Sequence, residues 1–468
     1  MLEQEHAGQS SWGITTTVLE QPGIETLKAS LRGELFQPGE EGYDAARTMY
    51  NAMIDRHPAL IVRCAGVSDV ITAVQFARSR NLLVAIRGGG HNVAGRAICD
   101  GGLVIDLSRM KGIHVDPAHC IARAEPGVTW CEFDRETQAF GLATTGGTVS
   151  STGIAGLTLG GGIGWLMRTC GLACDNLVSV DLVTAEGRLL RASATENPDL
   201  FWGVRGAGAN FGVVTSFEYQ LHPVGPLLGG LLIHPFSKAR DVLRFYRDVA
   251  ATAPDELTAL AALLTLPEGE PVVAIAPFYN GPMKAGEEVM QPLRAFGPPL
   301  ADHVGPMSYL QVQTMLDAMM PAGLRNYWKT NFLKDLSDEA IDTLVTYFAT
   351  VPSALTAAVI EQFGGAVGRI GEDETAFSPR DQRFNLAIAS RWTDPAESEK
   401  HRQWTRDLWD VMQPFATDAV YVNYLPEDEG DRVKALYGAA KYERLVRLKN
   451  TYDPTNFFQL NANIKPTV

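Results

Sequence analysis

Long apolar segments and an excess of positive charge are both absent from this chain of 468 residues. No run approaches the roughly 18 apolar residues of a membrane helix. The N-terminal residues are polar and acidic, without the basic and apolar regions of a secretory signal. The formal net charge of -14 argues against nucleic acid or an anionic membrane as the main partner. We therefore expect a cytoplasmic protein that binds neither, with a processed precursor that has lost its leader as the alternative.

Cysteine is scarce as well: all six residues lie between positions 64 and 174, and they form no CxxC pair. Cys170 and Cys174 are close enough along the chain to form a disulfide or to share a metal. Buried free thiols are nevertheless favoured, as is usual in a reducing compartment. His91 has no second histidine, cysteine or carboxylate beside it at ligand spacing. The sequence therefore predicts no metal site.

Length and composition indicate a folded protein with more than one domain. Hydrophobic residues make up 46% of the chain and charged residues 20%, which are ordinary values for a globular protein. A chain of 468 residues exceeds what one hydrophobic core usually serves. Residues 59–125 alternate strand and helix patterns with glycine-rich turns, which is typical of α/β or α+β proteins.

The most informative segment is LLVAIRGGGHNVAG, residues 82–95. Its five apolar residues, 82–86, have the length of a buried strand that ends at a turn. The three glycines that follow have no Cβ atom, so their backbone can approach a ligand closely. Their amides can surround a pyrophosphate, with Arg87 as a neutralising charge. From this segment alone, an ordinary turn that carries a surface histidine at position 91 is an equal alternative.

Glycine is concentrated again in residues 146–171, which contain nine glycines. This is costly in chain entropy, and backbone that lies against a ligand explains it best. A third group, at residues 206–212, has the spacing GxGxxxG and follows a helix-like stretch. Rossmann dinucleotide sites need GxGxxG between a strand and a helix, so this group argues against such a site.

From about residue 223 to 417 the pattern changes to strands that alternate with amphipathic helices. An antiparallel sheet with helices on one side would leave its other face free to line a cavity. Strands are predicted at 226–235, 257–266, 271–281, 353–365 and 384–392, and helices at 238–251, 284–296, 337–350 and 397–415.

Several of these segments, in one order, resemble the FAD-linked oxidases of the berberine bridge enzyme type, within the vanillyl-alcohol oxidase superfamily. Bacterial members of the 6-hydroxynicotine oxidase type are the most similar in pattern. The resemblance spans about residues 55–465 and rests on RGGGHNVAG, GLVIDLSRMKGI, GGTVSSTGIAGLTLGGGIGWLMR, ANFGVVTSFEYQL, YVNYL and YDPTNFFQLNANIKP. It implies an α+β fold. A discontinuous PCMH-type FAD-binding domain would comprise residues 1–222 and 416–468, and a substrate-binding domain with an antiparallel sheet flanked by helices would comprise residues 223–415.

The resemblance also implies how FAD is held. In the family the histidine of RGGGH is bonded to the 8α-methyl group of the flavin; here that residue is His91, and such a bond makes the flavin a stronger oxidant. Many members add a link through cysteine, but the matching position here is Val149, so one covalent bond is expected. Thr152 should lie where O2 reaches the flavin, and its small side chain favours an oxidase; that Thr152 is simply a strand residue is an equal alternative. The other implied cofactor-binding residues are Arg87, Gly88, Gly89, Gly90, Asn92, Gly95, Thr148, Ser151, Gly153, Gly156, Gly161, Gly162, Val214, Asn423, Tyr424 and Asn461.

A base that takes the substrate proton is expected in the YxNY segment, where family members often place a tyrosine. Tyr424 is the first candidate for this catalytic role and Tyr421 the second. A phenol has a pKa near ~10, so a neighbouring cation or the flavin would have to lower that pKa. Tyrosines that only pack and form hydrogen bonds are the structural alternative.

Four further residues are weaker candidates for the base. Some plant members carry a glutamate just after a GG pair, where this chain has Arg369 instead. Strand alternation puts Glu361 and Gln362 on opposite faces, so only one of them can point into the cavity. Tyr327 and Lys329 complete this group.

The resemblance therefore predicts an FAD-dependent oxidase that takes a hydride from the C–H bond beside an alcohol or amine and reduces O2 to H2O2. Its partners would be O2 and a small-molecule substrate, namely a secondary metabolite, an alkaloid-like amine or a sugar. Two alternatives stay open: a flavin dehydrogenase with a non-oxygen acceptor, and a flavin-binding protein without turnover.

Overall fold

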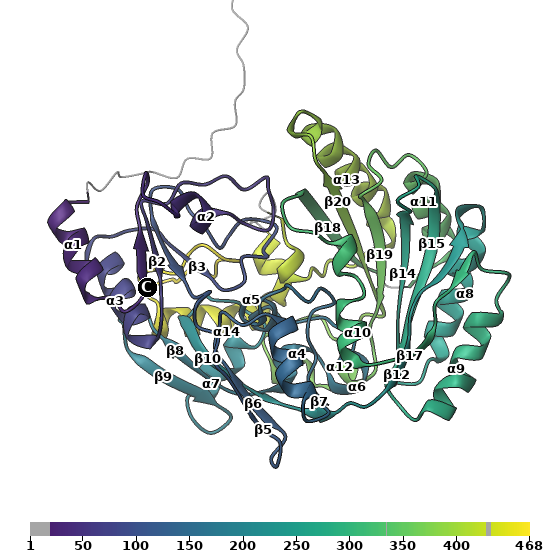
Figure 1. Cartoon of the computed structure of the whole chain (residues 1–468), viewed down its shortest axis with the longest axis horizontal. Helices are drawn as coiled ribbons and strands as arrows, with labels where there is room; N and C mark the ends of the chain where they lie inside the picture. The colour runs from purple at the N-terminus through teal and green to yellow at the C-terminus, as the bar shows by residue number, and fades with distance from the viewer. Residues whose placement is uncertain (1–18, 334, 427–431) are drawn as a thin grey trace, which may run out of the picture.

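The computed structural model describes residues 19–333, 335–426 and 432–468. Two smaller sheets and their helices form one part of the molecule, and a large sheet with helices on its outer side forms the other (Figure 1). This mixture of sheets and helices confirms the predicted α+β class. No helix in the described ranges is long and apolar enough to cross a membrane.

The first small sheet carries the segment that precedes His91. Its order is β1-β2-β4-β3, with β2, β4 and β3 parallel to one another. Val70, Val74 and Ala77 repeat at helical spacing along one face of α3 and are buried in the same core as strand residues of this sheet. The elements are α1 (Gln21–Ser30), β1 (Glu34–Phe36), α2 (Tyr43–Arg47), β2 (Leu60–Arg63), α3 (Val67–Ser79), β3 (Val84–Arg87) and β4 (Leu103–Asp106).

The second small sheet is antiparallel, with the order β5-β6-β10-β8-β9. Its core contains Leu436 and Leu445 of α14, so a late segment of the chain packs with residues 122–221. The strands are β5 (Ile113–Asp116), β6 (Ile121–Ala124), β8 (Leu177–Val183), β9 (Leu189–Ser193) and β10 (Val213–Gln220), and β7 (Leu142–Ala143) pairs with β11 (His222–Pro223). The helices are α4 (Trp130–Gln138), α5 (Ile154–Leu159), α6 (Met167–Cys170), α7 (Pro198–Val204) and α14 (Val433–Tyr452), with the 3-10 turn η1 (Ala173–Asn176).

The large sheet has the order β16-β13-β15-β14-β19-β20-β18, and β12 and β17 pair beside β15. Helices α8, α9, α11 and α13 cover its outer face (Figure 1). Its inner face packs on residues 163–174 and on Tyr421. The strands are β12 (Leu227–Gly229), β13 (Leu232–Pro235), β14 (Leu257–Thr265), β15 (Pro271–Tyr279), β16 (Ala301–Asp302), β17 (Gly305–Met307), β18 (Arg325–Leu333), β19 (Ala357–Gln362) and β20 (Phe384–Trp392). The helices are α8 (Ala239–Thr252), α9 (Met283–Ala295), α10 (Tyr309–Thr314), α11 (Asp338–Phe348), α12 (Ala366–Arg369) and α13 (Ser398–Met412).

Most of the strands and helices predicted for this part are confirmed, with two differences. The strand predicted at 226–235 is divided into β12 and β13, because Gly230 between them has a φ of +146° and breaks the extended run. Strand β18 was not predicted, since its polar residues Arg325, Asn326 and Lys329 obscure the alternation on which the prediction depended.

Candidate active site

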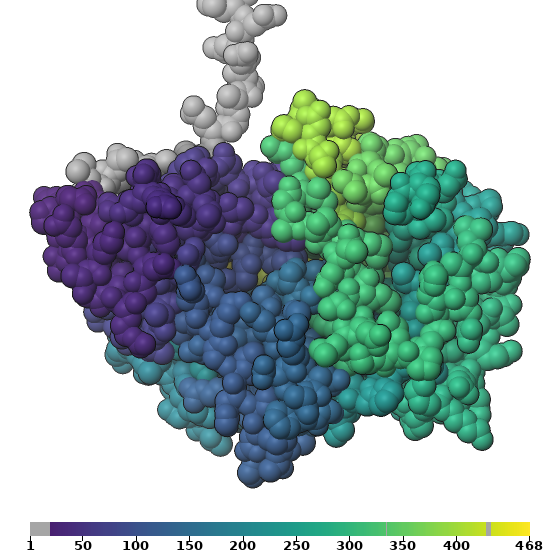
Figure 2. Space-filling view, viewed as in Figure 1, coloured from purple at the N-terminus to yellow at the C-terminus, as the bar shows by residue number. Residues whose placement is uncertain are grey.

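A cavity lies between the two small sheets and the inner face of the large sheet. Its walls come from within residues 86–97, 147–163, 207–209, 421–424 and 460–462, with Trp328 of β18. Figure 2 shows a hollow on the same side, between the purple and blue segments and the green segments. The predicted residues that line the cavity are Gly88, Gly89, Gly90, His91, Asn92, Thr148, Thr152, Gly153, Gly156, Tyr421, Asn423, Tyr424 and Asn461.

The two predicted glycine loops meet in the wall of this cavity. A Cβ atom on Gly89 would lie 2.6 Å from the backbone nitrogen of Gly153, and one on Gly153 would lie as close to Gly89. Only glycine at both positions permits this approach. Gly156 and Gly208 also line the cavity, and a Cβ atom on either would meet nothing within 4 Å. This part of the wall is therefore bare backbone that faces open space.

Six predicted cofactor residues are not among the described residues that line the cavity. The Arg87 guanidinium donates to the carbonyl of Ala46, and Val214 is buried in a hydrophobic core. The positions of Gly161 and Gly162 are explained by packing, since a Cβ atom there would collide with neighbouring side chains. The full set is Arg87, Gly95, Ser151, Gly161, Gly162 and Val214.

His91 follows β3 at the edge of the first glycine loop. The ring of Tyr50 stacks on its imidazole, with a centroid distance of 3.7 Å and an interplanar angle of 21°. Ser151 Oγ lies 3.4 Å from Nε2. Burial lowers the pKa of His91 to about 4, so the imidazole is neutral at pH 7 and keeps a free lone pair. Val149, the position of the missing cysteine link, also lines the cavity.

Tyr421 and Tyr424 lie in the 3-10 turn that contains η7 (Val422–Tyr424). The Tyr421 hydroxyl accepts from the backbone N–H groups of Gly162 and Ile163, at 3.1 Å and 3.4 Å, and from Asn423 Nδ2 at 2.9 Å. Burial raises the pKa of this phenol. Tyr421 is therefore held as a buried acceptor that orders the second glycine loop.

The Tyr424 hydroxyl donates to Glu361 Oε1 at 3.1 Å. Its ring packs edge-on against Trp328, at a centroid distance of 5.6 Å. Burial and the neighbouring Glu361 raise the pKa of Tyr424. These surroundings act in the direction opposite to the lowered phenol pKa that a base role for Tyr424 requires.

Glu361 lies on β19 and is 4% exposed. Its Oε2 accepts from Asn385 Nδ2 at 2.6 Å, and Asn385 Oδ1 accepts from Thr330 Oγ1 at 2.5 Å. Burial raises the pKa of Glu361 to about 7, although the hydrogen bonds from Asn385 and Tyr424 act in the opposite direction. A carboxyl group with this pKa can both accept and release a proton near neutral pH.

The other candidates for the base face elsewhere. Gln362 points to the opposite side of β19, where its Oε1 accepts from Ala259 N and its Nε2 donates to Ala250 O. Lys329 stacks on Trp409 of the outer helix α13. Tyr327 is packed by two arginines of the same helix. Arg369, which stands in place of the glutamate of some plant members, is not a candidate and pairs with Asp255. Of these residues, only Glu361 contacts Tyr424.

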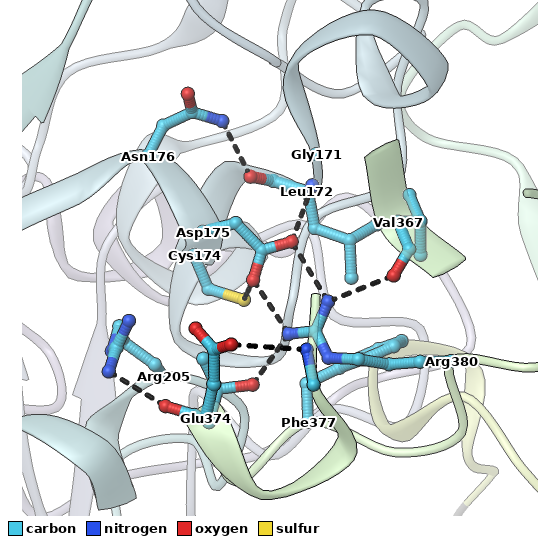
Figure 3. Close-up of polar contacts among 12 residues, drawn as sticks. Gly171, Leu172, Cys174, Asp175, Asn176, Arg205, Val367, Glu374, Phe377 and Arg380 are labelled. Atoms are coloured by element: carbon cyan, nitrogen blue, oxygen red, sulfur yellow. Dashed lines mark hydrogen bonds and ion pairs between the residues drawn. The ribbon is translucent and has the colours of Figure 1, made fainter. Parts of the chain in front are cut away.

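A buried ion pair joins η1 to the loop that carries Arg380 (Figure 3). Asp175 of η1 pairs with Arg380, at 2.6 Å, and each side chain is 3% exposed. Arg380 also donates to Thr375 Oγ1 and to the Val367 carbonyl. The same loop carries Phe377, whose ring packs against Tyr421. The ion pair therefore anchors residues 371–380 of the middle segment to the part that carries the glycine loops.

The six cysteines are free, and Cys64, Cys99 and Cys174 are buried, as expected for unpaired thiols. In the described ranges, no three histidine, cysteine or carboxylate side chains gather in a way that could hold a metal.

Several lining or supporting residues were missed by sequence reasoning. Gly208 belongs to the GxGxxxG group, which was used only to argue against a Rossmann site. Tyr50, Asp317 and Asn385 contact His91, Ser150 and Glu361, respectively, and each pair joins distant segments for which the sequence carries no local signal.

Glycine loops that expose bare backbone to a cavity, together with a neutral histidine at its edge, define a nucleotide-cofactor site of the flavoprotein kind. Residues 58–193 match the family model described as an FAD binding domain, and residues 420–465 match the one described as berberine and berberine like.

Whole-chain comparisons agree with these matches. An FAD-linked oxidoreductase of Dictyostelium discoideum is 33% identical, over 93% of this chain and 95% of that protein. The (R)-6-hydroxynicotine oxidase of Paenarthrobacter nicotinovorans is 32% identical, over 93% and 97%. The crystal structure of 6-hydroxy-D-nicotine oxidase from Arthrobacter nicotinovorans covers 93% of this chain and 98% of that one, with 30% identity and a TM-score of 0.86. The chain belongs to the berberine bridge enzyme-like FAD-linked oxidoreductases, and its PCMH-type fold is confirmed.

The residues of the cavity fit FAD. The loops that meet at Gly89 and Gly153 bring backbone amides to one wall, as a pyrophosphate requires. Asn461 lines the cavity, and its buried Oδ1 has no hydrogen-bond partner among the described residues. A buried acceptor of this kind needs a donor, which the N–H edge of a flavin can supply.

Proposed function

We propose that this protein is an oxidase that removes a hydride from the C–H bond beside an alcohol or amine of a small organic molecule and passes the electrons to O2. Bound FAD would supply the hydride acceptor. The observation that carries the proposal is the hydrogen bond from Tyr424, in the cavity wall, to a buried carboxyl group with a pKa of about 7. Relatives over nearly the whole chain include the (R)-6-hydroxynicotine oxidase of Paenarthrobacter nicotinovorans.

Loss of a hydride from an alcohol or amine also requires loss of a proton. In our proposal the substrate O–H or N–H donates to Tyr424 Oη, because the phenol proton already points to Glu361. As the hydride leaves, the substrate proton moves to Tyr424 and the phenol proton moves to Glu361. The carboxylate of Glu361 is thus the final acceptor, and Tyr424 stays neutral before and after the step, in keeping with its raised pKa.

Covalent attachment of FAD through His91 is part of the proposal. The neutral imidazole at the cavity edge has the free lone pair that such a bond requires. With Val149 at the position of the second anchor, His91 would hold the cofactor alone. We also place the domain boundaries near residues 222 and 416, because one core combines residues 122–221 with 433–464 and another lies within residues 228–412.

The test uses the purified full chain with FAD. Small alcohols, amines and oligosaccharides are screened for H2O2 release with a peroxidase-coupled dye, and the reduced enzyme is then mixed rapidly with O2. We expect peroxide from at least one class and reoxidation faster than that of free reduced flavin. Slow reoxidation, together with turnover on an artificial electron acceptor, would identify a dehydrogenase instead. Bound flavin that no compound reduces would identify a carrier.

A further inference from the structure

His91 is held by residues outside the two glycine loops. Tyr50, whose ring lies parallel to the imidazole, is fixed at three points. Its N–H donates to the carbonyl of Gly90 at 3.3 Å, and its own carbonyl accepts from Gly323 N at 3.1 Å. Its hydroxyl donates to the carbonyl of Met320 at 3.3 Å. The stacked ring therefore cannot turn away without breaking contacts with residues 320–323.

The segment of residues 313–323, which holds Tyr50, also forms hydrogen bonds with the second glycine loop. Asp317, in a 3-10 turn after α10, accepts from Ser150 N at 2.9 Å and from Ser150 Oγ at 2.6 Å. Gln313 Nε2 donates to the carbonyl of Gly147. The next residue after Ser150 is Ser151, whose hydroxyl approaches His91 Nε2. Residues 313–323 thus hold the surroundings of the imidazole in place through Tyr50 and through the second glycine loop, and we call this segment the clamp.

The clamp has its own support on the large sheet. Arg391 of β20 donates to the carbonyl of Met319 and lies near Met320 Sδ, at 3.0 Å. The Arg391 residue is only 5% exposed. The position of Asp317 therefore depends on β20 of the large sheet.

We propose that Tyr50 and Asp317 are positioning residues for the covalent attachment of FAD to His91. This inference rests on the attachment proposed above. The bond that forms joins a ring nitrogen of His91 to the 8α carbon of the isoalloxazine, while the imidazole N–H proton leaves to solvent. The C–H bond broken at that carbon gives up a proton and leaves its electron pair on the ring system. O2 then takes up that pair with two protons and becomes H2O2.

The physical reason is orientation. A nucleophile held at a reacting distance and angle gains a large effective concentration, and a displacement of about 1 Å can cost roughly 100-fold in rate. Stacking by Tyr50 fixes the plane of the imidazole. Asp317 fixes the position of the loop that carries Ser151, because it accepts hydrogen bonds from Ser150. The carboxylate of Asp317 also acts electrostatically on His91, where it favours positive charge on the ring. Positive charge develops on the imidazole as the new bond forms.

The experiment follows attachment directly and needs no substrate. The full chain is purified from riboflavin-limited cells, mixed with FAD in air and quenched in denaturant at timed intervals. Flavin fluorescence in a denaturing gel and the mass of the intact chain report the covalent fraction. We expect Tyr50→Leu and Asp317→Asn each to slow attachment about tenfold or more. Tyr50→Phe keeps the stacked ring but loses the bond to Met320, so it should slow attachment less than Tyr50→Leu does.

Non-covalent FAD affinity and the thermal unfolding midpoint separate positioning from a structural role. Both are measured for each substitution in a His91→Ala background, where no bond can form. We expect both to be retained in the Asp317→Asn chain and in the control Asp241→Asn, an exposed aspartate of α8. Loss of FAD affinity together with attachment, or unchanged attachment rates in Tyr50→Leu and Asp317→Asn, would overturn the inference. Absence of covalent flavin in the unaltered chain would instead refute the proposed attachment itself.

Discussion

Replacement of Glu361 by glutamine tests the proposed proton transfer most directly. Glutamine has nearly the same shape, and its Oε1 can accept from Tyr424 as the carboxylate does. Its Nε2 would face Asn385, which can rotate its amide to present oxygen, because the Thr330 hydroxyl can accept as well as donate. The network therefore survives, and only the capacity to take a proton is lost.

The predicted effect on the reaction follows from the pKa of Glu361, which burial raises from 4.5 to about 7. In the unaltered enzyme the rate of flavin reduction should rise with pH through about 7, as the carboxyl group becomes ionised. In Glu361→Gln that rise should vanish, and the rate at pH 8 should fall by about 100-fold or more, as for loss of a general base. Anaerobic stopped-flow absorbance, with a substrate identified by peroxide release, measures both.

The same raised pKa predicts that Glu361→Gln, although it slows the reaction, stabilises the folded protein at high pH. Because the folded-state pKa lies above the unfolded value, folding opposes ionisation of Glu361. The contribution of protonated Glu361 to the free energy of unfolding is complete below about pH 4.5 and is lost as the pH rises to about 7. At about 1.4 kcal/mol per pH unit the total loss is about 3 kcal/mol. Glu361→Gln should therefore be stabilised, relative to the unaltered chain, more at pH 8 than at pH 5.

Unfolding midpoints at the two pH values check this stability prediction, with Glu339→Gln on the exposed face of α11 as the matched control. A variant that keeps the pH dependence of flavin reduction would refute the assignment of Glu361 as proton acceptor. Equal stability differences at pH 5 and pH 8 would refute the raised pKa.

Three further outcomes are expected. Gly89→Ala should abolish FAD binding, measured by flavin fluorescence quenching, because its Cβ would lie 2.6 Å from the opposite loop; Gly225→Ala, with open space around it, should bind normally. Asp175→Asn should lower the free energy of unfolding by about 3–5 kcal/mol in denaturant titration, since Arg380 would stay buried without its partner. His91→Ala should bind FAD but lose acid-stable colour, so colour that survives in the denatured variant would place the covalent bond elsewhere.

Sequence reasoning located the cofactor wall better than the catalytic groups. The glycine loops were recognisable because Gly89 and Gly153 meet a local requirement, a backbone without Cβ, which their sequence spacing reveals. Strand alternation correctly separated Glu361 from Gln362. It could not decide which one faces the cavity, because that depends on how β19 sits between β14 and β20.

Other parts of the site depend on contacts that no single segment encodes. Tyr424 was named as a candidate base whose pKa a cation or the flavin would have to lower, whereas burial and Glu361 raise it. Burial of a hydroxyl is decided by the elements packed around it. Asp317 acts on Ser150 across 167 positions of the sequence, and a pairing over such a separation is set by tertiary packing alone.

The placement of residues 460–462 in the cavity wall has a consequence for biosynthesis. These residues line the same cavity as residues 88–93, which the ribosome makes about 370 positions earlier. Domains generally fold as units while synthesis proceeds, but this one cannot close its core until α14 and residues 460–462 have emerged. The strands of the large sheet, which end at residue 392, have then already been synthesised. The cavity is therefore complete only after residues 460–462 have been made.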